Sequence, residues 1–275
     1  GDADIAIACG VENMTRVPMG SDMGGFSNDL INRFNIVPQG YSAEMIAEKC
    51  GLTREELDAY SLESHKRAAL AVDQGLFERE IIPLKIQDEA GVINFATDEG
   101  IRRDTSLEKL AGLKPSFLPE SGVITAGNSS QISDGAAGML LMSKDKANSL
   151  GLKPRAKIVA RVAVGIDPVI MLTGVIPATK KVLEKAGLSF EQMDVIEINE
   201  AFASVVKAWE KEFHPDMKKV NPRGGAIALG HPLGASGARL ATTLLHTLED
   251  TNGQYGLQVM CIGFGMATAT IMERL

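Results

Sequence analysis

The sequence predicts an α/β fold in which mostly parallel sheets are covered by helices. From Pro154 onward, apolar runs of strand length alternate with longer stretches of helical period. Such alternation is typical of layered domains built from strand–helix–strand units. The chain has 275 residues, of which 45% are hydrophobic, so it can bury a proper core in one large or two modest domains.

In the first half of the chain, short predicted elements are separated by loops. Residues 1–10 alternate isoleucine with small residues, as in a buried strand, and residues 11–40 show no clear period. A helix is expected over 41–50, and a capping box of Thr53 and Glu56 predicts a longer helix that closes at Gly75. The other expected elements are short strands within 81–95, a turn and helix over 98–114, a glycine- and serine-rich turn at 122–133 and a buried strand at 136–142.

The second half is more regular. Strands are expected at 156–164, 195–198, 258–262 and about 268–272, and helices at 178–186 and 201–213. Residues 226–229 are interpreted as the end of a short buried strand, and Leu240, Leu244 and Leu248 recur every four residues in a helix. A glycine-rich turn that carries His231 joins these two elements.

His231 is the first candidate functional residue. A histidine between a strand end and a helix N-terminus lies where α/β sheets place ligands, and its imidazole exchanges protons near neutral pH. The alternative is a buried structural histidine that bonds a carbonyl group, but the glycine density of segment 224–237 favours a functional turn. The segment matches neither a P-loop nor a GxSxG elbow, and Ser236 is interpreted as a helix-start residue.

The composition excludes several classes of function. A net charge of −7 does not favour binding to nucleic acid or to an anionic membrane surface. No apolar run approaches the roughly twenty residues that span a bilayer. Three dispersed cysteines indicate free thiols in a reducing compartment, and four dispersed histidines without HExxH or CxxC give no metal signal. We therefore expect a cytoplasmic protein with no metal, no nucleic-acid partner and no membrane insertion.

Two further polar residues are expected, like His231, just beyond strand ends of this half. Taken singly, Asn199 is explained as a helix cap and Cys261 as an inert buried thiol. Together with His231 they supply an amide, a thiol and an imidazole, which acyl transfer through a thioester needs for proton transfer and oxyanion stabilisation. Gly263 and Gly265 leave backbone N–H groups open to such an oxyanion, whereas a GxGxxG nucleotide site would need a following helix.

At these residues the chain resembles a known family. NEAFA at 199–203, GGAIALGHPLGASGAR at 224–239 and CIGFGMATATIMERL at 261–275 are similar to the C-terminal motifs of thiolases, the acetyl-CoA acyltransferases. YSAEMIAEKCGLTREELDAYSLESHKRA, TSLEKLAGLKPSF and TAGNSSQISDGAA extend the resemblance over the whole chain. It implies an enzyme that cleaves 3-ketoacyl-CoA with CoA to acetyl-CoA and a shortened acyl-CoA, or runs the reverse condensation. CoA is then a substrate, and no permanently bound cofactor is expected.

The resemblance also implies roles for individual residues. His231 would activate the nucleophile and, with a water held by Asn199, bind the thioester oxygen. Cys261 would protonate and deprotonate the acetyl carbon or the CoA thiol, and the Gly263 N–H would help form a second oxyanion hole. The expected CoA contacts are Ser130 at pantetheine, Arg102 at the nucleotide end and Met171 in the pocket wall.

The resemblance further implies a thiolase-like layered fold of two similar halves with an inserted loop domain. On that map, residues 1–10 and 124–153 are the remnant of an N-terminal core domain, so that the first half is incomplete. Residues 11–123 form the loop domain that covers CoA, and 154–275 form the C-terminal core domain. A homodimer or homotetramer is expected, completed by the missing N-terminal segment.

Some features depart from the family pattern. The nucleophilic cysteine has no counterpart, because Cys9 lies in a predicted strand and Cys50 in a predicted helix, so the chain alone is expected to be inactive. Phe264 stands where the family usually has glycine and can narrow or reshape the acyl pocket. NSSQISDG at 128–135 resembles degradative members. The alternative function is a non-catalytic CoA-binding or interaction module. A condensing synthase of the related ketoacyl class is a weaker alternative, because Cys261 stands where such a synthase has histidine or asparagine.

Overall fold

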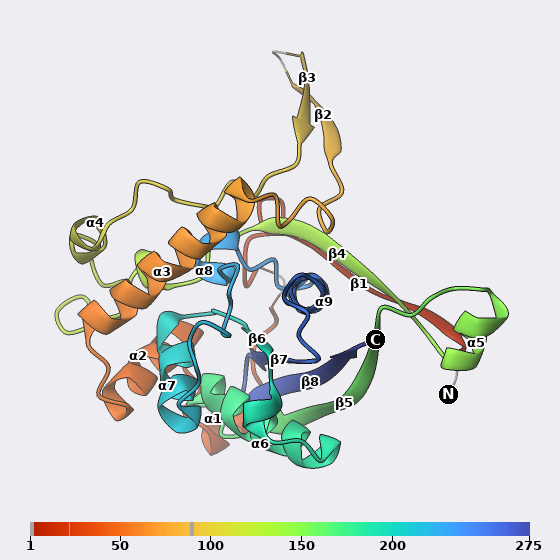
Figure 1. The fold of residues 1–275 in the computed structure, drawn as a ribbon. Coiled ribbons are helices and arrows are strands. Elements are labelled where there is room, and N and C mark those ends of the chain that lie inside the picture. The colour runs from red at the N-terminus through yellow and green to blue at the C-terminus, as the bar shows by residue number, and fades with distance from the viewer. Residues whose placement is uncertain (1–2, 22, 89–90) are drawn as a thin grey trace.

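A computed structural model describes residues 3–21, 23–88 and 91–275 (Figure 1). Helix α9 (Ser236–Thr251) lies between a long two-stranded ribbon and a four-stranded sheet, and it contacts strands of both. Helices α6 (Val175–Ala186) and α7 (Ala203–Phe213) lie on the other side of the four-stranded sheet, and α6 packs directly on its strands. The α/β class is confirmed, with sheets and helices in alternating layers.

The four-stranded sheet is mixed rather than mostly parallel, which corrects the expectation. Its order is β5 (Ala156–Gly165), β8 (Met266–Arg274), β7 (Tyr255–Ile262) and β6 (Val195–Ile198). Only β6 and β7 run parallel, whereas β8 is antiparallel to both of its neighbours. The reason is the tight turn after Ile262, because a short connection can join only antiparallel strands.

The ribbon pairs β1 (Ile5–Asn13) with β4 (Asp134–Met142) in antiparallel register. The expectation that residues 1–10 form a buried strand is wrong for the described part, because Ile5 is 41% exposed and Ile7 70%. Among the described residues β1 has only β4 as a paired strand, and α9 covers one face of the ribbon. The apolar alternation therefore predicts the strand correctly but not its burial.

Of the next five helices, the first four lie on one side of the molecule and the fifth lies at the far end of the ribbon (Figure 1). They are α1 (Asn28–Arg33), α2 (Gln39–Lys49), α3 (Arg54–Asp73), α4 (Leu107–Ala111) and α5 (Lys144–Ser149). The predicted capping box of α3 is confirmed, because Thr53 and Glu56 bond each other's backbone N–H groups. A hairpin of β2 (Leu84–Asp88) and β3 (Gly91–Phe95) projects away from the body of the molecule (Figure 1).

The strand expected at 226–229 is wrong, since these residues form the short helix α8 (Ala226–Leu229). Distant side chains hold both of its ends. At the start, Ser64 Oγ accepts from Gly225 N–H at 3.1 Å and a Glu200 oxygen accepts from Ile227 N–H at 3.1 Å. At the end, Gln131 Nε2 donates to the Ile227 carbonyl at 2.7 Å. Such tertiary caps are not visible in a short apolar run.

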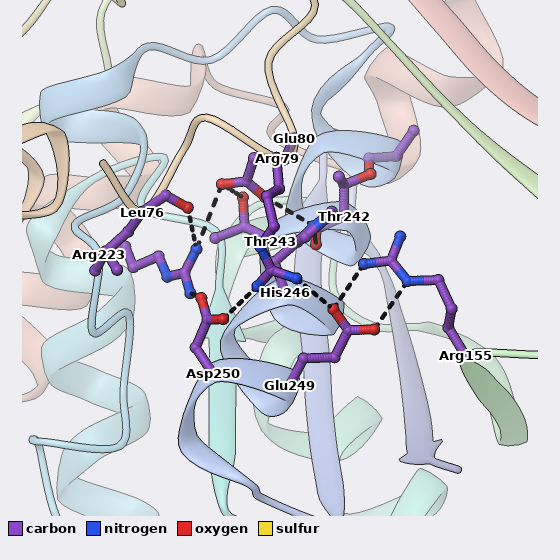
Figure 2. A network of polar contacts seen from close by, with 11 residues as sticks. Leu76, Arg79, Glu80, Arg155, Arg223, Thr242, Thr243, His246, Glu249 and Asp250 are labelled. Atoms are coloured by element: carbon purple, nitrogen blue, oxygen red, sulfur yellow. Dashed lines mark hydrogen bonds and ion pairs between the residues drawn. The ribbon is translucent and has the colours of Figure 1, made fainter. Parts of the chain in front are cut away.

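Polar contacts anchor the second half of α9 (Figure 2). Buried Arg223 donates to the Leu76 carbonyl at 2.6 Å and pairs with Asp250 of α9, so the segment after α3 is tied to this helix. Glu249, the preceding residue, pairs with Arg155 at 2.7 Å, and this hydrogen bond lowers its pKa to about 2. The other end of the same helix therefore holds a fixed position, and that end carries the candidate site.

Candidate functional site

His231 lies in the turn between α8 and α9, where two backbone features set its position. Gly230 has φ +88, a conformation that glycine adopts freely, and a Cβ there would lie 2.0 Å from Ser133 Oγ. The His231 N–H donates to the Gln131 carbonyl at 3.1 Å. The predicted strand end before His231 is a helix end, but the residue does stand just before a helix N-terminus, as expected.

Ser236 determines which nitrogen of the His231 ring carries the proton. The Ser236 hydroxyl donates its only hydrogen to the Pro232 carbonyl at 2.8 Å. Its Oγ lies 2.6 Å from His231 Nδ1 and therefore accepts from Nδ1–H. This leaves Nε2 without a proton, so Nε2 accepts from Asn199 Nδ2 at 3.1 Å. The ring presents a basic nitrogen beside an amide.

Burial keeps this imidazole neutral. Burial and, to a lesser degree, the positive charge of Arg239 lower the pKa of His231 from 6.5 to about 4. Arg239 lies one turn after Ser236 on α9. At neutral pH, His231 can therefore accept a proton rather than hold one.

Asn199 stands immediately after β6, and its backbone N–H donates to the Val259 carbonyl of β7 at 3.0 Å. The residue is fully buried, and its Oδ1 has no hydrogen-bond partner among the described residues. The sheet thus holds the amide at the end of a strand, as predicted, and points it to His231. The structure brings Asn199 and His231 together across 32 residues of sequence.

The neighbouring Glu200 joins three segments at this site. Its Oε1 accepts from Tyr60 Oη at 2.7 Å and from Asn221 Nδ2 at 3.0 Å, and its Oε2 accepts from Ser64 Oγ at 2.7 Å and Ile227 N–H at 3.1 Å. The carboxylate is buried and tightly packed against Gly225, because a Cβ on Gly225 would lie 2.3 Å from Cδ of Glu200. Glu200 therefore fixes the Asn199 segment against the segment that leads to His231.

Cys261 lies within β7, opposite Ala267 of β8, and belongs to the main hydrophobic core. Burial raises the pKa of its thiol to about 12, so the group is protonated at neutral pH. No hydrogen bond joins its sulfur to His231 or Asn199 among the residues that the structure describes. Its position is one residue before the end of the strand rather than beyond it.

The turn after Cys261 carries Gly263, Phe264 and Gly265, and Met171 lies beneath it. Met171 is fully buried, and its sulfur accepts from the Phe264 N–H at 3.2 Å. The predicted wall residue thus contacts the turn that holds the predicted oxyanion donor Gly263. In the described ranges, no group of three or more His, Cys, Asp or Glu side chains is placed to hold a metal ion.

The two remaining predicted contacts are Ser130 and Arg102. The Ser130 N–H donates to the Ala201 carbonyl at 3.0 Å, which places it beside the segment of Asn199. Arg102 is exposed, and its N–H donates to Nδ1 of buried His65 at 3.1 Å. The structure groups Ser130 with the site, whereas no contact joins the described atoms of Arg102 to it.

Sequence reasoning missed Glu200 and Gln131 and gave Ser236 only a helix-start role. Glu200 stands in the quoted motif NEAFA, so a charged residue beside Asn199 inside a buried segment was the available signal. For Gln131 no local signal existed, because its side chain bonds carbonyls 31, 96 and 97 residues away. Over the described residues, no helix is both long and apolar enough to cross a membrane.

Comparisons with known proteins agree with this geometry. The family model of the thiolase N-terminal domain matches residues 1–145, and that of the thiolase C-terminal domain matches residues 152–274. A steroid 3-ketoacyl-CoA thiolase of Mycobacterium tuberculosis is 50% identical over 100% of this chain and 69% of its own length. A 3-ketoacyl-CoA thiolase of Aliivibrio fischeri is 47% identical over 100% of this chain and 72% of its own length.

Solved structures show the same likeness. Human mitochondrial 3-ketoacyl-CoA thiolase superposes with a TM-score of 0.89 at 36% identity, over 100% of this chain and 73% of that one. Acetyl-CoA acetyltransferase of Bacillus anthracis gives a TM-score of 0.89 at 37% identity with the same coverage. Two family models that together span nearly the whole sequence, and relatives that match all of it, establish that this chain belongs to the thiolase family.

Proposed function

We propose that this thiolase acts in the degradative direction, cleaving 3-ketoacyl-CoA with CoA to acetyl-CoA and a shortened acyl-CoA. The relatives that match the full chain are named 3-ketoacyl-CoA thiolases, and nothing among them favours a non-catalytic module. The observation that carries the proposal is the contact between the unprotonated Nε2 of His231 and the amide of Asn199. It combines a base with a hydrogen-bond donor at one point of the site.

In the proposed first half-reaction, His231 Nε2 takes the proton of the nucleophilic cysteine that the family resemblance implies. The cysteine sulfur attacks C3 of the substrate. Asn199 helps to stabilise the negative charge that forms on the C3 oxygen. The C2–C3 bond then breaks. Carbon C2 of the leaving acetyl-CoA takes the proton of Cys261, whose raised pKa keeps that proton available at neutral pH.

In the second half-reaction, the Cys261 thiolate takes the proton of incoming CoA, and the CoA sulfur attacks the acyl-enzyme. A thiolate whose acid has a pKa of about 12 is a strong base, so this transfer is downhill. The nucleophilic cysteine leaves and takes back the proton from His231. The Gly263 N–H is proposed to stabilise the enolate oxygen while C2 carries charge.

The proposed CoA contacts extend outward from this centre. Ser130, beside the Asn199 segment, is proposed to contact pantetheine, and exposed Arg102 the phosphates of the nucleotide. Met171 is proposed to line the pocket. We propose the same domain map as above, with 11–123 as the loop domain, together with a cytoplasmic homo-oligomer that holds CoA only as substrate.

The test is thiolysis by the complete protein that carries this chain. His231→Ala and Cys261→Ala should each lower kcat by at least about a hundredfold, which is the usual contribution of a general acid or base. Cys9→Ala is the matched control, since it removes an exposed thiol from β1 and should leave kcat unchanged. Near-normal turnover in either of the first two variants would refute the assigned roles.

A further inference from the structure

The side chain of Gln131 bridges two segments that are far apart in the sequence. Its Nε2 donates to the Ile227 carbonyl at 2.7 Å, to the Gly100 carbonyl at 2.8 Å and to the Ala228 carbonyl at 3.2 Å. An amide nitrogen carries two hydrogens, so the two shorter contacts use both of them and the third shares one. Ile227 and Ala228 belong to α8, whereas Gly100 belongs to the segment that follows β3. One side chain therefore ties that segment to α8.

The backbone of Gln131 lies against the turn that carries His231. Its carbonyl accepts from the His231 N–H at 3.1 Å and from the Ser133 hydroxyl at 3.0 Å, and its N–H donates to the Ala226 carbonyl at 3.4 Å. The two backbones pack closely here, because a Cβ on Gly230 would lie 2.0 Å from Ser133 Oγ. A shift of Gln131 must therefore also shift the backbone of His231, the proposed base.

The segment on the other side of Gln131 leads to Arg102. Gly100 packs closely on α8, because a Cβ there would lie 2.8 Å from the Ala228 carbonyl oxygen. Two residues later, the Arg102 N–H donates to Nδ1 of buried His65 at 3.1 Å. The backbone of 100–102 is thus held at both ends, while Arg102 is exposed and can meet a ligand. Hydrogen bonds therefore connect the segment of this exposed arginine, through Gln131, to the turn of His231.

We infer that Gln131 is a positioning residue, through which binding of the nucleotide end of CoA at Arg102 fixes the position of His231. The inference rests on the proposed function, which assigns the nucleotide to Arg102 and the base to His231. The nucleotide takes no part in the reaction, so its binding energy raises kcat only if the protein carries it to the reacting atoms. Because Gln131 is bonded to both segments, a ligand that orders 100–102 also orders the His231 turn. Without this link, the nucleotide would improve affinity alone.

The kinetic test compares two substrates in the complete protein, a 3-ketoacyl-CoA and the same acyl group on pantetheine, which lacks the nucleotide. In the wild type, kcat should be about tenfold higher with the CoA thioester, the factor that one hydrogen bond is worth in rate. Gln131→Met keeps the length of the side chain but donates no hydrogen bond, so the two kcat values should become nearly equal. Gly100→Ala should have the same effect, because its Cβ pushes the segment off Gln131 but leaves the α8 carbonyls bonded.

Two controls separate this role from a purely structural one. Gln192→Met changes a glutamine whose side-chain oxygen caps a turn before β6, and it should keep the wild-type ratio of kcat values. Equal kcat values in the wild type would overturn the inference. So would an equal loss of kcat with both substrates in Gln131→Met, which is what a purely structural role produces. If Gln131→Met does not fold, Gly100→Ala decides.

Histidine NMR tests the link without turnover. The probe is adenosine 3′,5′-bisphosphate, which resembles the nucleotide end of CoA and carries no acyl group. His65 contacts the Arg102 backbone, so its imidazole signal should shift on binding in the wild type and in both variants. The His231 signal should shift in the wild type but stay in place in Gln131→Met and Gly100→Ala.

Two NMR results would overturn the inference. One is a His231 shift that persists in both variants, and the other is the absence of a His65 shift in the wild type. If the wild type cleaves no 3-ketoacyl-CoA, the proposed function fails, and the NMR titration alone then decides whether Gln131 links the two segments.

Discussion

The Oγ atom of Ser236 lies 2.6 Å from Nδ1 of His231, and this contact decides the chemistry of the ring. Because the serine hydrogen is already donated to Pro232, the imidazole must be protonated on Nδ1 and free on Nε2. A residue that caps no helix, although it begins one, thus sets the tautomer of the proposed base.

Ser236→Ala should lower kcat by about tenfold. The variant removes a hydrogen bond worth roughly 1 to 1.5 kcal/mol, and one such bond corresponds to about a factor of ten in rate. Imidazole nitrogen shifts in a histidine-labelled sample should show a mixture of tautomers in Ser236→Ala and the Nδ1–H form alone in the wild type. Ser236→Thr keeps the hydroxyl and serves as the control. Identical nitrogen spectra for Ala and wild type would contradict the assignment.

Glu200→Gln should destabilise the protein by roughly 1 to 3 kcal/mol, the cost of leaving buried donors without acceptors. The carboxylate faces four donors, a hydroxyl group and an N–H group on each oxygen, so an amide NH2 group in place of either oxygen must oppose the N–H of Asn221 or that of Ile227. Urea unfolding measures the loss. The control, Glu212→Gln, changes an ion pair on the surface of α7 and should stay within about 0.5 kcal/mol of the wild type. A neutral Glu200→Gln would show that the network is not needed.

Much of the fold could be predicted from local patterns. The bounds of β6, the Thr53–Glu56 capping box and the buried stripe of Leu240, Leu244 and Leu248 were all visible, because each depends on neighbours in sequence. Mixed strand direction was not visible, since apolar runs do not record which way a strand runs.

The candidate site could be chosen from the sequence as residues but not as contacts. Asn199, His231 and Cys261 stood out as polar groups beside apolar runs, whereas α8 was mistaken for a strand. Its caps, Ser64 and Gln131, come from segments far away in sequence, and so do the partners of Glu200. These contacts exist only after the loop segments fold onto the sheet, so no periodicity in the chain could reveal them.

His231 should remain neutral down to about pH 4. Because the unfolded chain binds a proton near pH 6.5 and the folded chain does not, this residue lowers stability as the pH falls from 6.5 to 4. Arg239→Met removes a positive charge and should raise the pKa of His231, as read by NMR titration of the imidazole Cε1–H signal. Arg103→Met, at the exposed pair with Asp73, should leave it unchanged. A wild-type pKa near 6.5 would contradict the buried setting.

Glu197 should give stability the opposite pH dependence. This carboxyl lies fully buried on β6, and neither oxygen has a hydrogen-bond partner among the described residues. Burial raises its pKa from 4.5 to about 8, although Arg239 opposes the shift. Between those values the folded state holds a proton that the unfolded state has lost, so stability falls as the pH rises from 4.5 to 8.

Glu197→Gln cannot ionise, and it should therefore gain stability relative to the wild type as the pH rises. The gain is at most a few kcal/mol by pH 8, because each unit of pKa shift corresponds to about 1.4 kcal/mol. Urea unfolding at pH 5 and at pH 8 measures it as the difference between variant and wild type. Glu184→Gln on the exposed face of α6 should give the same difference at both pH values. A Glu197→Gln difference that does not change with pH would mean that Glu197 is already ionised in the folded protein, held by Arg239 as an ion pair.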